Sequence, residues 1–241
     1  MPKLQPIVQV AGARSAGEAL MLARAGVTHV GLPLRLPVHK PDVTEAEARG
    51  IVAALAAHGG ETQAVCITYV TDAAETLDLC RFLGVAGVQL HGAMPLEEVR
   101  RLRAAAPGLF LIKSLVVGTA DAAGLLDLAQ AHAPFVDAFL TDTFDPATGA
   151  AGATGRTHDW AISARLVRAL PRPLILAGGL NAENVERAVL AVHPAGVDAH
   201  TGLEDTDGGK NETLVRRFVA GARRAFHSLG VAGLAKDCES K

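Results

Sequence analysis

Short apolar runs alternate with longer amphipathic segments along the whole chain. Each apolar run suits a buried parallel strand, and each amphipathic segment carries its apolar residues at helical spacing. The pattern predicts eight strand–helix units in succession. The expected strands are 7–10, 29–32, 64–70, 87–90, 109–113, 136–141, 174–177 and 196–199, and the expected helices are 15–25, 44–57, 73–83, 95–105, 120–131, 159–169, 182–192 and 212–229.

Eight such units within 241 residues fit the size of an α/β protein built as a single (β/α)8 TIM barrel. A doubly wound parallel sheet alternates in the same way and stays open as the rival fold. The polar and glycine-rich residues follow the strands, which favours the barrel, because a barrel carries its site at the carboxyl ends of its strands. We expect one barrel domain at 1–229, and a disordered C-terminal tail at 230–241 because that segment lacks a pattern.

Composition narrows the classes of function. The formal net charge of −2 argues against a nucleic-acid partner, and no apolar run reaches the roughly 18 residues that a membrane span needs. Three cysteines without metal-ligand spacing, and no visible leader segment, lead us to expect a cytoplasmic protein. Cys66 lies within a predicted strand and is interpreted as a core residue. Barrels occur as monomers and as dimers, so both a monomer and a homodimer stay open.

Two glycine-bearing turns are the first candidate site. Gly178 and Gly179 follow the seventh predicted strand, where they allow positive φ and leave backbone N–H groups bare, and Asn181 suits the N-cap of the next helix. Thr201 and Gly202 follow the eighth strand. Because turns after the last two strands are the usual phosphate site of a barrel, we predict phosphate binding there. A tight connection without a ligand is the alternative.

Polar residues at the strand exits supply the candidate chemistry. Asp142 ends the sixth strand, where partial desolvation would raise its pKa and suit a general acid; a structural aspartate is the alternative. His91 is a base or, more in keeping with its position, a structural histidine, and Lys113 is placed to pair with Asp142 or an anion. His200 follows the eighth strand. Further polar groups at the expected mouth are Gln9, Arg14, Thr68 and Thr143.

The long segment at 144–158 carries three glycines, Gly149, Gly152 and Gly155. Segments of this length within a compact domain are usually functional or disordered. We interpret it as a lid over a ligand or, equally, as an insertion without a function.

Five motifs together resemble the phosphoribosylanthranilate isomerase family of (β/α)8 enzymes. They lie at 88–92, 140–143, 152–160, 176–185 and 197–204, in the order found in the family. The resemblance implies an Amadori rearrangement of an aminoaldose to an aminoketose in tryptophan biosynthesis, with a sugar phosphate as substrate and without a metal or organic cofactor. It also implies that Asp142 is the general acid on the ribose ring oxygen, and that the phosphate binds at Gly178-Gly179 and Thr201-Gly202.

The chain departs from the family in its first strand. That strand ends in Lys-Ile-Cys-Gly in the family, where the cysteine is the general base, but reads Gln9-Val10-Ala11-Gly12 here. Ala11 has no group that can accept a proton, and Gln9 replaces the lysine. The family's arginine for the anthranilate carboxylate has no clean counterpart, although Arg35 and Lys40 lie in the matching region. His200 stands where the family has a small residue.

Three functions stay open on this basis. The first is the isomerisation with a replacement base, for which His200 is the first choice and Cys66 or a water the others. In that reading Asp142 and His200 are catalytic, while His91, Lys113 and Arg14 join the two turns in binding substrate. The second is another reaction on a sugar phosphate, with Asp142 and Lys113 as acid–base groups. The third is a non-catalytic barrel that binds a phosphorylated ligand.

Overall fold

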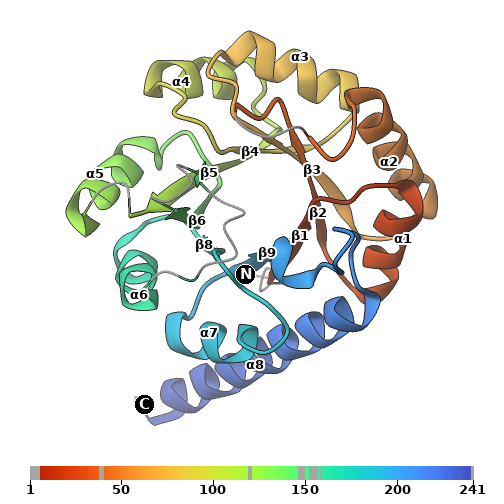
Figure 1. Cartoon of the computed structure of the whole chain (residues 1–241). Coiled ribbons are helices and arrows are strands. Elements are labelled where there is room, and N and C mark those ends of the chain that lie inside the picture. The colour runs from red at the N-terminus through yellow and green to blue at the C-terminus, as the bar shows by residue number, and fades with distance from the viewer. Residues whose placement is uncertain are drawn as a thin grey trace.

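Eight parallel strands form a closed barrel with helices around it (Figure 1). The structure is a computed structural model that describes residues 6–37, 41–118, 121–145, 150–151, 157 and 159–239. The barrel strands are β1 (Ile7–Ala11), β2 (His29–Leu34), β3 (Gln63–Thr68), β4 (Gly87–Leu90), β5 (Phe110–Val117), β6 (Ala138–Asp145), β8 (Leu174–Leu176) and β9 (Gly196–Ala199).

Strand pairing decides between the two predicted folds. The order runs β5-β4-β3-β2-β1-β9-β8-β6, and β5 also pairs with β6, so the sheet closes on itself. The first and last strands of the chain are neighbours, with Gln9 opposite Asp198 and Val10 opposite Ala199. The prediction of a (β/α)8 barrel is confirmed, and the doubly wound sheet is excluded because it would leave two edges open.

The helices occupy nearly the ranges that the periodicity predicts. They are α1 (Ala16–Ala25), α2 (Glu45–His58), α3 (Ala73–Leu83), α4 (Leu96–Ala105), α5 (Ala122–His132), α6 (Trp160–Ala169), α7 (Val185–Val192) and α8 (Glu212–Glu239). Side-chain caps explain several starts. Ser15 accepts the N–H of Glu18, and Thr44 forms a reciprocal capping box with Glu47.

Two helix boundaries differ from the prediction. Helix α7 begins at Val185 rather than at 182, because the Asn181 side chain accepts the N–H groups of Glu183 and Asn184 and so holds a turn there. Helix α8 continues through Glu239, so the backbone of 230–239 is helical where we expected a tail. Residues 240–241 and the predicted helix start at 120 lie outside the described residues.

The segment at 144–158 begins as a hairpin. Strand β6 continues to Asp145, and the short β7 (Ala150–Ala151) pairs with it in antiparallel fashion. Residues 146–149, 152–156 and 158, which include all three glycines of the predicted lid, lie outside the described residues.

Strand alternation separates two apolar regions. One lies between strands and helices, and a smaller one fills the barrel interior with Val65, Ile112, Ala138, Leu140, Ile175 and Ala177. Cys66 belongs to the outer region, where a hydrogen bond with Cys80 and burial raise its pKa. The interpretation of Cys66 as a core residue is therefore confirmed, and its thiol faces away from the barrel interior. Among the described helices, none is long and apolar enough to cross a membrane.

Candidate functional site

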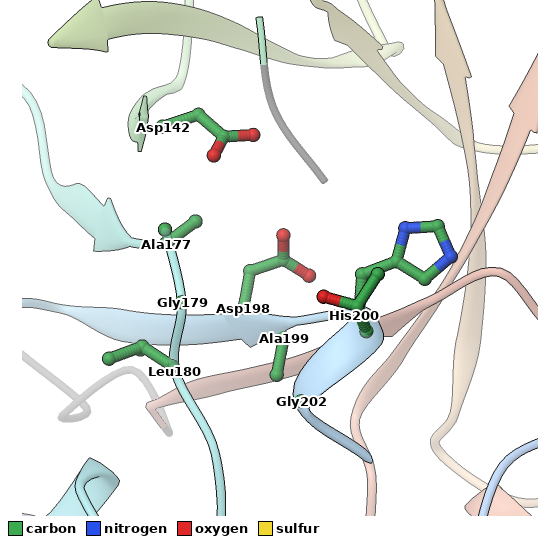
Figure 2. Close-up of a pocket in the computed structure, with 10 residues that line it drawn as sticks. Asp142, Ala177, Gly179, Leu180, Asp198, Ala199, His200 and Gly202 are labelled. Carbon is green, nitrogen blue, oxygen red and sulfur yellow. The ribbon is translucent and has the colours of Figure 1, made fainter. Parts of the chain in front are cut away.

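One pocket opens at the carboxyl ends of β6, β8 and β9 (Figure 2). Its walls come from the end of β6, the turn after β8, the inward face of β9 and the 3₁₀ turn η1 (Thr201–Leu203). The pocket brings together four of the predicted binding residues and both predicted catalytic ones. The lining residues are Asp142, Ala177, Gly178, Gly179, Leu180, Asp198, Ala199, His200, Thr201 and Gly202.

The two glycine turns pack directly against each other. Gly178 and Gly179 have φ of 94° and 63°, a left-handed conformation that other residues rarely adopt. A Cβ atom on Gly202 would lie 2.3 Å from the Leu180 carbonyl oxygen, so only glycine fits there. Within the described part of the chain, the backbone N–H groups of Gly179 and Thr201 have no hydrogen-bond partner. Such turns can offer several N–H donors to one anion.

Asp142 occupies the inward face of β6 beside His91. Its Oδ2 lies 3.8 Å from His91 Nε2, and its Oδ1 accepts the N–H of Thr143 at 2.7 Å. Burial raises the pKa of Asp142 above its usual value, while the facing imidazole and the Thr143 N–H oppose part of that rise. The position and the direction of the shift suit a carboxyl group that donates a proton.

His91 is held in place from three sides. Its Nδ1 lies 2.9 Å from Ser114 Oγ, the Tyr69 ring packs against it with centroids 4.8 Å apart, and its Nε2 faces Asp142. Burial, followed by the charge of Asp142, raises the pKa of Tyr69. This arrangement fixes the imidazole against Asp142 rather than leaving it at the pocket wall.

A layer of polar side chains crosses the barrel beneath the pocket. Gln9 Nε2 donates to Gln89 Oε1 at 2.9 Å, and Gln89 Nε2 lies 3.4 Å from both Ser114 Oγ and His91 Nδ1. The layer therefore connects β1 through β4 and β5 to the histidine that faces Asp142. Buried amides in such a chain hold each other in a defined orientation.

Asp198 is a site residue that the strand-exit reasoning missed. It lies inside β9 on the inward face, is buried, and its Oδ1 has no hydrogen-bond partner among the described residues. Burial and the charge of Asp142 raise the pKa of Asp198 to about 7, while the Gln9 side chain, Lys210 and the Ala199 N–H oppose the rise. The signal available in the sequence was an acid in the middle of an otherwise apolar strand.

His200 lines the pocket, but its ring is turned toward β1. A Cβ on Gly12 would lie 2.2 Å from His200 Nε2, and the same nitrogen lies 3.3 Å from Glu204 Oε1. In Figure 2 the imidazole extends to the side, away from Asp142. Burial, together with the charge of Lys210, lowers the pKa of His200 to about 3, which makes the imidazole a poor proton acceptor.

Lys113 and Arg14 lie elsewhere than predicted. Lys113 alternates with Leu111 and Leu115 on the outer face of β5, and its Nζ donates to the carbonyl oxygens of Leu90 and Gly92 at 3.3 and 2.9 Å. Burial lowers the pKa of Lys113 to about 8. Exposed Arg14 donates to the Asp207 carbonyl oxygen, which ties it to the segment before α8. Neither side chain lines the pocket.

The rim near β1 carries carboxylates. Lys210 Nζ lies 2.5 Å from Glu204 Oε1, and Asp42 Oδ2 lies 4.0 Å from His200 Nε2. Arg35 is held by Glu45 and Glu75, each at 2.8 Å, so its guanidinium is already paired. The other candidate for the anthranilate carboxylate, Lys40, lies outside the described residues. In the described ranges, no three His, Cys, Asp or Glu side chains are placed to share a metal ion.

The amino-acid sequence is similar to those of N-(5'-phosphoribosyl)anthranilate isomerases. The model of the family described as N-(5'-phosphoribosyl)anthranilate (PRA) isomerase matches residues 16–221. N-(5'-phosphoribosyl)anthranilate isomerase 2 of Methanosarcina mazei is 35% identical over 91% of this chain and 95% of that protein. The isomerase of Haloferax volcanii is 38% identical over 90% and 93%, respectively.

Solved structures agree with these sequence matches. The phosphoribosylanthranilate isomerase of Thermotoga maritima superposes with a TM-score of 0.76 at 28% identity, covering 90% of this chain and 98% of that one. A complex of such an isomerase with reduced 1-(o-carboxyphenylamino)-1-deoxyribulose 5-phosphate gives a TM-score of 0.74 at 25% identity, with the same coverage.

Proposed function

Because the chain belongs to the N-(5'-phosphoribosyl)anthranilate isomerase family, we propose that it isomerises a phosphoribosylamine from aminoaldose to aminoketose. The observation that carries the proposal is a single pocket that unites the Asp142 carboxyl with the two glycine turns. The substrate named by the relatives, phosphoribosylanthranilate, is the first candidate, which would place the chain in tryptophan biosynthesis.

The isomerisation requires a site that binds the phosphate group and side chains that transfer protons at two positions of the sugar. The turns at Gly178-Gly179 and Thr201-Gly202 would fix the sugar through its phosphate. Protonated Asp142 would donate to the ring oxygen as the C1–O bond breaks and the nitrogen lone pair forms a C1=N bond. Loss of the C2 proton then gives an enolamine, which tautomerises to the ketone. Every atom is conserved, so no oxidant or reductant is required.

The same proposal includes the binding partner, the assembly and the location of the protein. The partner would be a small sugar phosphate and not a nucleic acid, and the assembly would be a monomer or a homodimer. A cytoplasmic location is in keeping with the reduced, buried thiols of Cys66 and Cys80.

The direct test is an assay of the purified chain on phosphoribosylanthranilate, together with rescue of a tryptophan auxotroph that lacks the isomerase. Turnover in vitro and growth without tryptophan are the expected results. Asp142→Asn serves as the inactive control, and Asp78→Asn, which alters an exposed carboxylate on α3, serves as the matched active control. Absence of turnover by a folded wild-type chain would overturn the proposal.

A second candidate is isomerisation of a phosphorylated aminosugar with another organic half. The charges at the rim favour this second candidate. Arg35 is already paired, and Asp42 and Glu204 are themselves carboxylates, so none of the three attracts an anthranilate carboxylate. Parallel assays with an uncharged aniline analogue and with the anthranilate compound would separate the two. Faster turnover of the uncharged analogue supports this candidate. Binding of both without turnover supports the non-catalytic barrel instead.

A further inference from the structure

We propose that the Asp198 carboxylate accepts the C2 proton of the substrate and so replaces the base that the first strand lacks. The inference rests on the proposed isomerisation and adds to it the identity of the second proton-transfer group. It makes the pair of buried carboxyls, Asp142 and Asp198, the acid and the base of one pocket.

The first support is the position of Asp198 beside the position that lost its base. Strands β1 and β9 are hydrogen-bonded neighbours, with Gln9 opposite Asp198. Ala11 follows Gln9 by two residues on the same inward face of β1. A carboxylate on the adjacent strand therefore reaches the same side of the barrel as a side chain at Ala11 would.

The second support is that Asp198 and Asp142 open into one space. Both line the pocket, from strands that have β8 between them. In Figure 2 the two carboxylates extend toward the same opening above the glycine turns. A sugar held by its phosphate at those turns would present its ring to both groups, which is the arrangement that separate acid and base steps require.

The third support is a free proton acceptor on Asp198. Its buried Oδ1 has no hydrogen-bond partner within the described residues, and neither does Oε1 of neighbouring Gln9. A buried carboxylate oxygen without a donor is costly and is retained where a ligand or a reaction uses it. Glutamine at position 9 also leaves Asp198 without the adjacent cation that a lysine would supply, so an ion pair does not occupy the carboxylate.

The electrostatics agree with this geometry. The pKa of Asp198, raised to about 7 by burial and by Asp142, lies near the value that suits a general base at neutral pH. The other groups that act on it are the Gln9 side chain, the Lys210 ammonium and the Ala199 N–H. Cys66 faces the helices and His200 Nε2 faces Gly12 and Glu204, so neither predicted replacement base competes for this position.

The step balances within the isomerisation. After Asp142 has opened the ring and the C1=N bond has formed, Asp198 takes the C2 proton. The C–H electron pair becomes the C1=C2 bond, and the C1=N pair returns to nitrogen. The protonated Asp198 then returns this proton to C1 as the enolamine becomes the ketone, and the proton of the 2-hydroxyl passes to the Asp142 carboxylate, which restores the acid. The net change is the movement of one hydrogen from C2 to C1 and of the 2-hydroxyl proton to the former ring oxygen, with both carboxyl groups restored.

The test compares Asp198→Asn, Ala11→Cys/Asp198→Asn and the control Asp78→Asn with wild type across pH 5–9. In wild type, the limb of the kcat/KM profile that rises with pH should have its midpoint near pH 7, where Asp198 loses its proton. In Asp198→Asn, kcat should fall by about 10²–10⁴-fold because the base is absent. The rise of kcat/KM with pH should disappear for the same reason. In Ala11→Cys/Asp198→Asn, kcat should recover at least tenfold, because a thiolate at position 11 can accept the proton. The rise in kcat/KM of this double variant should lie at higher pH than that of wild type. Asp78→Asn should match wild type.

A second variant keeps the test decisive if Asp198→Asn does not fold. Gln9→Lys would place an ammonium beside Asp198, which should shift the rise in kcat/KM to lower pH by about one unit or more. An unchanged profile in Gln9→Lys would overturn the assignment of Asp198. Retention of wild-type kcat by folded Asp198→Asn would do the same, and so would failure of the cysteine to restore turnover. An inactive wild-type chain would instead overturn the proposed isomerisation itself.

Discussion

At the scale of single residues, the proposed chemistry depends on two buried carboxyl groups, Asp142 and Asp198. Asp142 was accessible to sequence reasoning because it follows the apolar strand predicted at 136–141, although β6 itself continues to Asp145. Asp198 was not, because it lies within a strand and only its register opposite Gln9 reveals its place. The outer position of Lys113 was equally hidden, since one residue of register decides which face of β5 a side chain occupies.

Replacement of Asp142 by asparagine tests the acid. We expect kcat to fall by about 10²–10⁴-fold, because the amide cannot protonate the ring oxygen. The melting temperature should stay the same or rise, since burial disfavours the charged carboxylate in the folded state. Steady-state kinetics and a thermal melt of the same preparation check both. More than a tenth of wild-type kcat in the folded variant would contradict the assignment.

Asp198 should make the folded state less stable as pH rises. Its pKa is 3.8 in the unfolded reference and about 7 in the fold, so between these values the folded chain binds more protons. Its contribution to stability is therefore present below pH 4 and is lost as pH approaches 7. Asparagine does not titrate, so Asp198→Asn should gain more in melting temperature over wild type at pH 8 than at pH 5. Equal gains at the two pH values would contradict the raised pKa.

The element scale shows what periodicity can and cannot predict. The eight strand–helix units follow from apolar spacing and from caps such as Thr44 with Glu47. The late start of α7 does not, because local hydrogen bonds of Asn181 compete with the first helical turn. The orientation of His200 depends on Gly12, which follows β1 and is far away in the sequence, so no local pattern of residues encodes it.

Gly202→Ala tests the contact between the two turns. The added methyl group would collide with the Leu180 carbonyl oxygen, so the turns must separate. We expect affinity for inorganic phosphate or a sugar phosphate to fall at least tenfold, measured by competitive inhibition or by ligand-induced thermal stabilisation.

Gly50→Ala is the matched control for that substitution. A Cβ at this position on α2 meets nothing within 4 Å. Affinity should therefore stay unchanged, while stability should rise by up to about 1 kcal/mol because alanine is the better helix former. Equal phosphate affinities of the two variants would argue against the turns as the anion site.

At the scale of the whole molecule, a cluster of hydrogen bonds around Arg103 and the pocket lie at opposite ends of the barrel. Arg103, on α4, donates to the carbonyl oxygens of Phe135, Pro107 and Leu109 and pairs with Asp137, which also accepts the Leu111 N–H. These partners lie where β5 and β6 begin. The pocket residues lie where the strands end, as expected of a barrel.

Arg103→Met should separate the two ends experimentally. Loss of the guanidinium leaves several carbonyls and the Asp137 carboxylate with fewer donors, so we expect a loss of roughly 1–3 kcal/mol in the free energy of unfolding. Below the melting transition, kcat and KM should stay unchanged. Arg101→Met, which removes an exposed pair with Glu98, should cost no more than about 1 kcal/mol. A drop in kcat for Arg103→Met would show that the ends are coupled.

The pairing of β1 with β9 joins the first strand of the chain to the last. Gln9 is synthesised well before Asp198 and Thr201, yet the pocket requires β9 to lie between β1 and β8. A growing chain on the ribosome therefore carries Asp142 and both glycines of the first turn without a site in which to use them. A ligand bound to the turns after β8 and β9 would stabilise the pairing of β9 with its neighbouring strands. Ligand binding would therefore favour closure of the barrel.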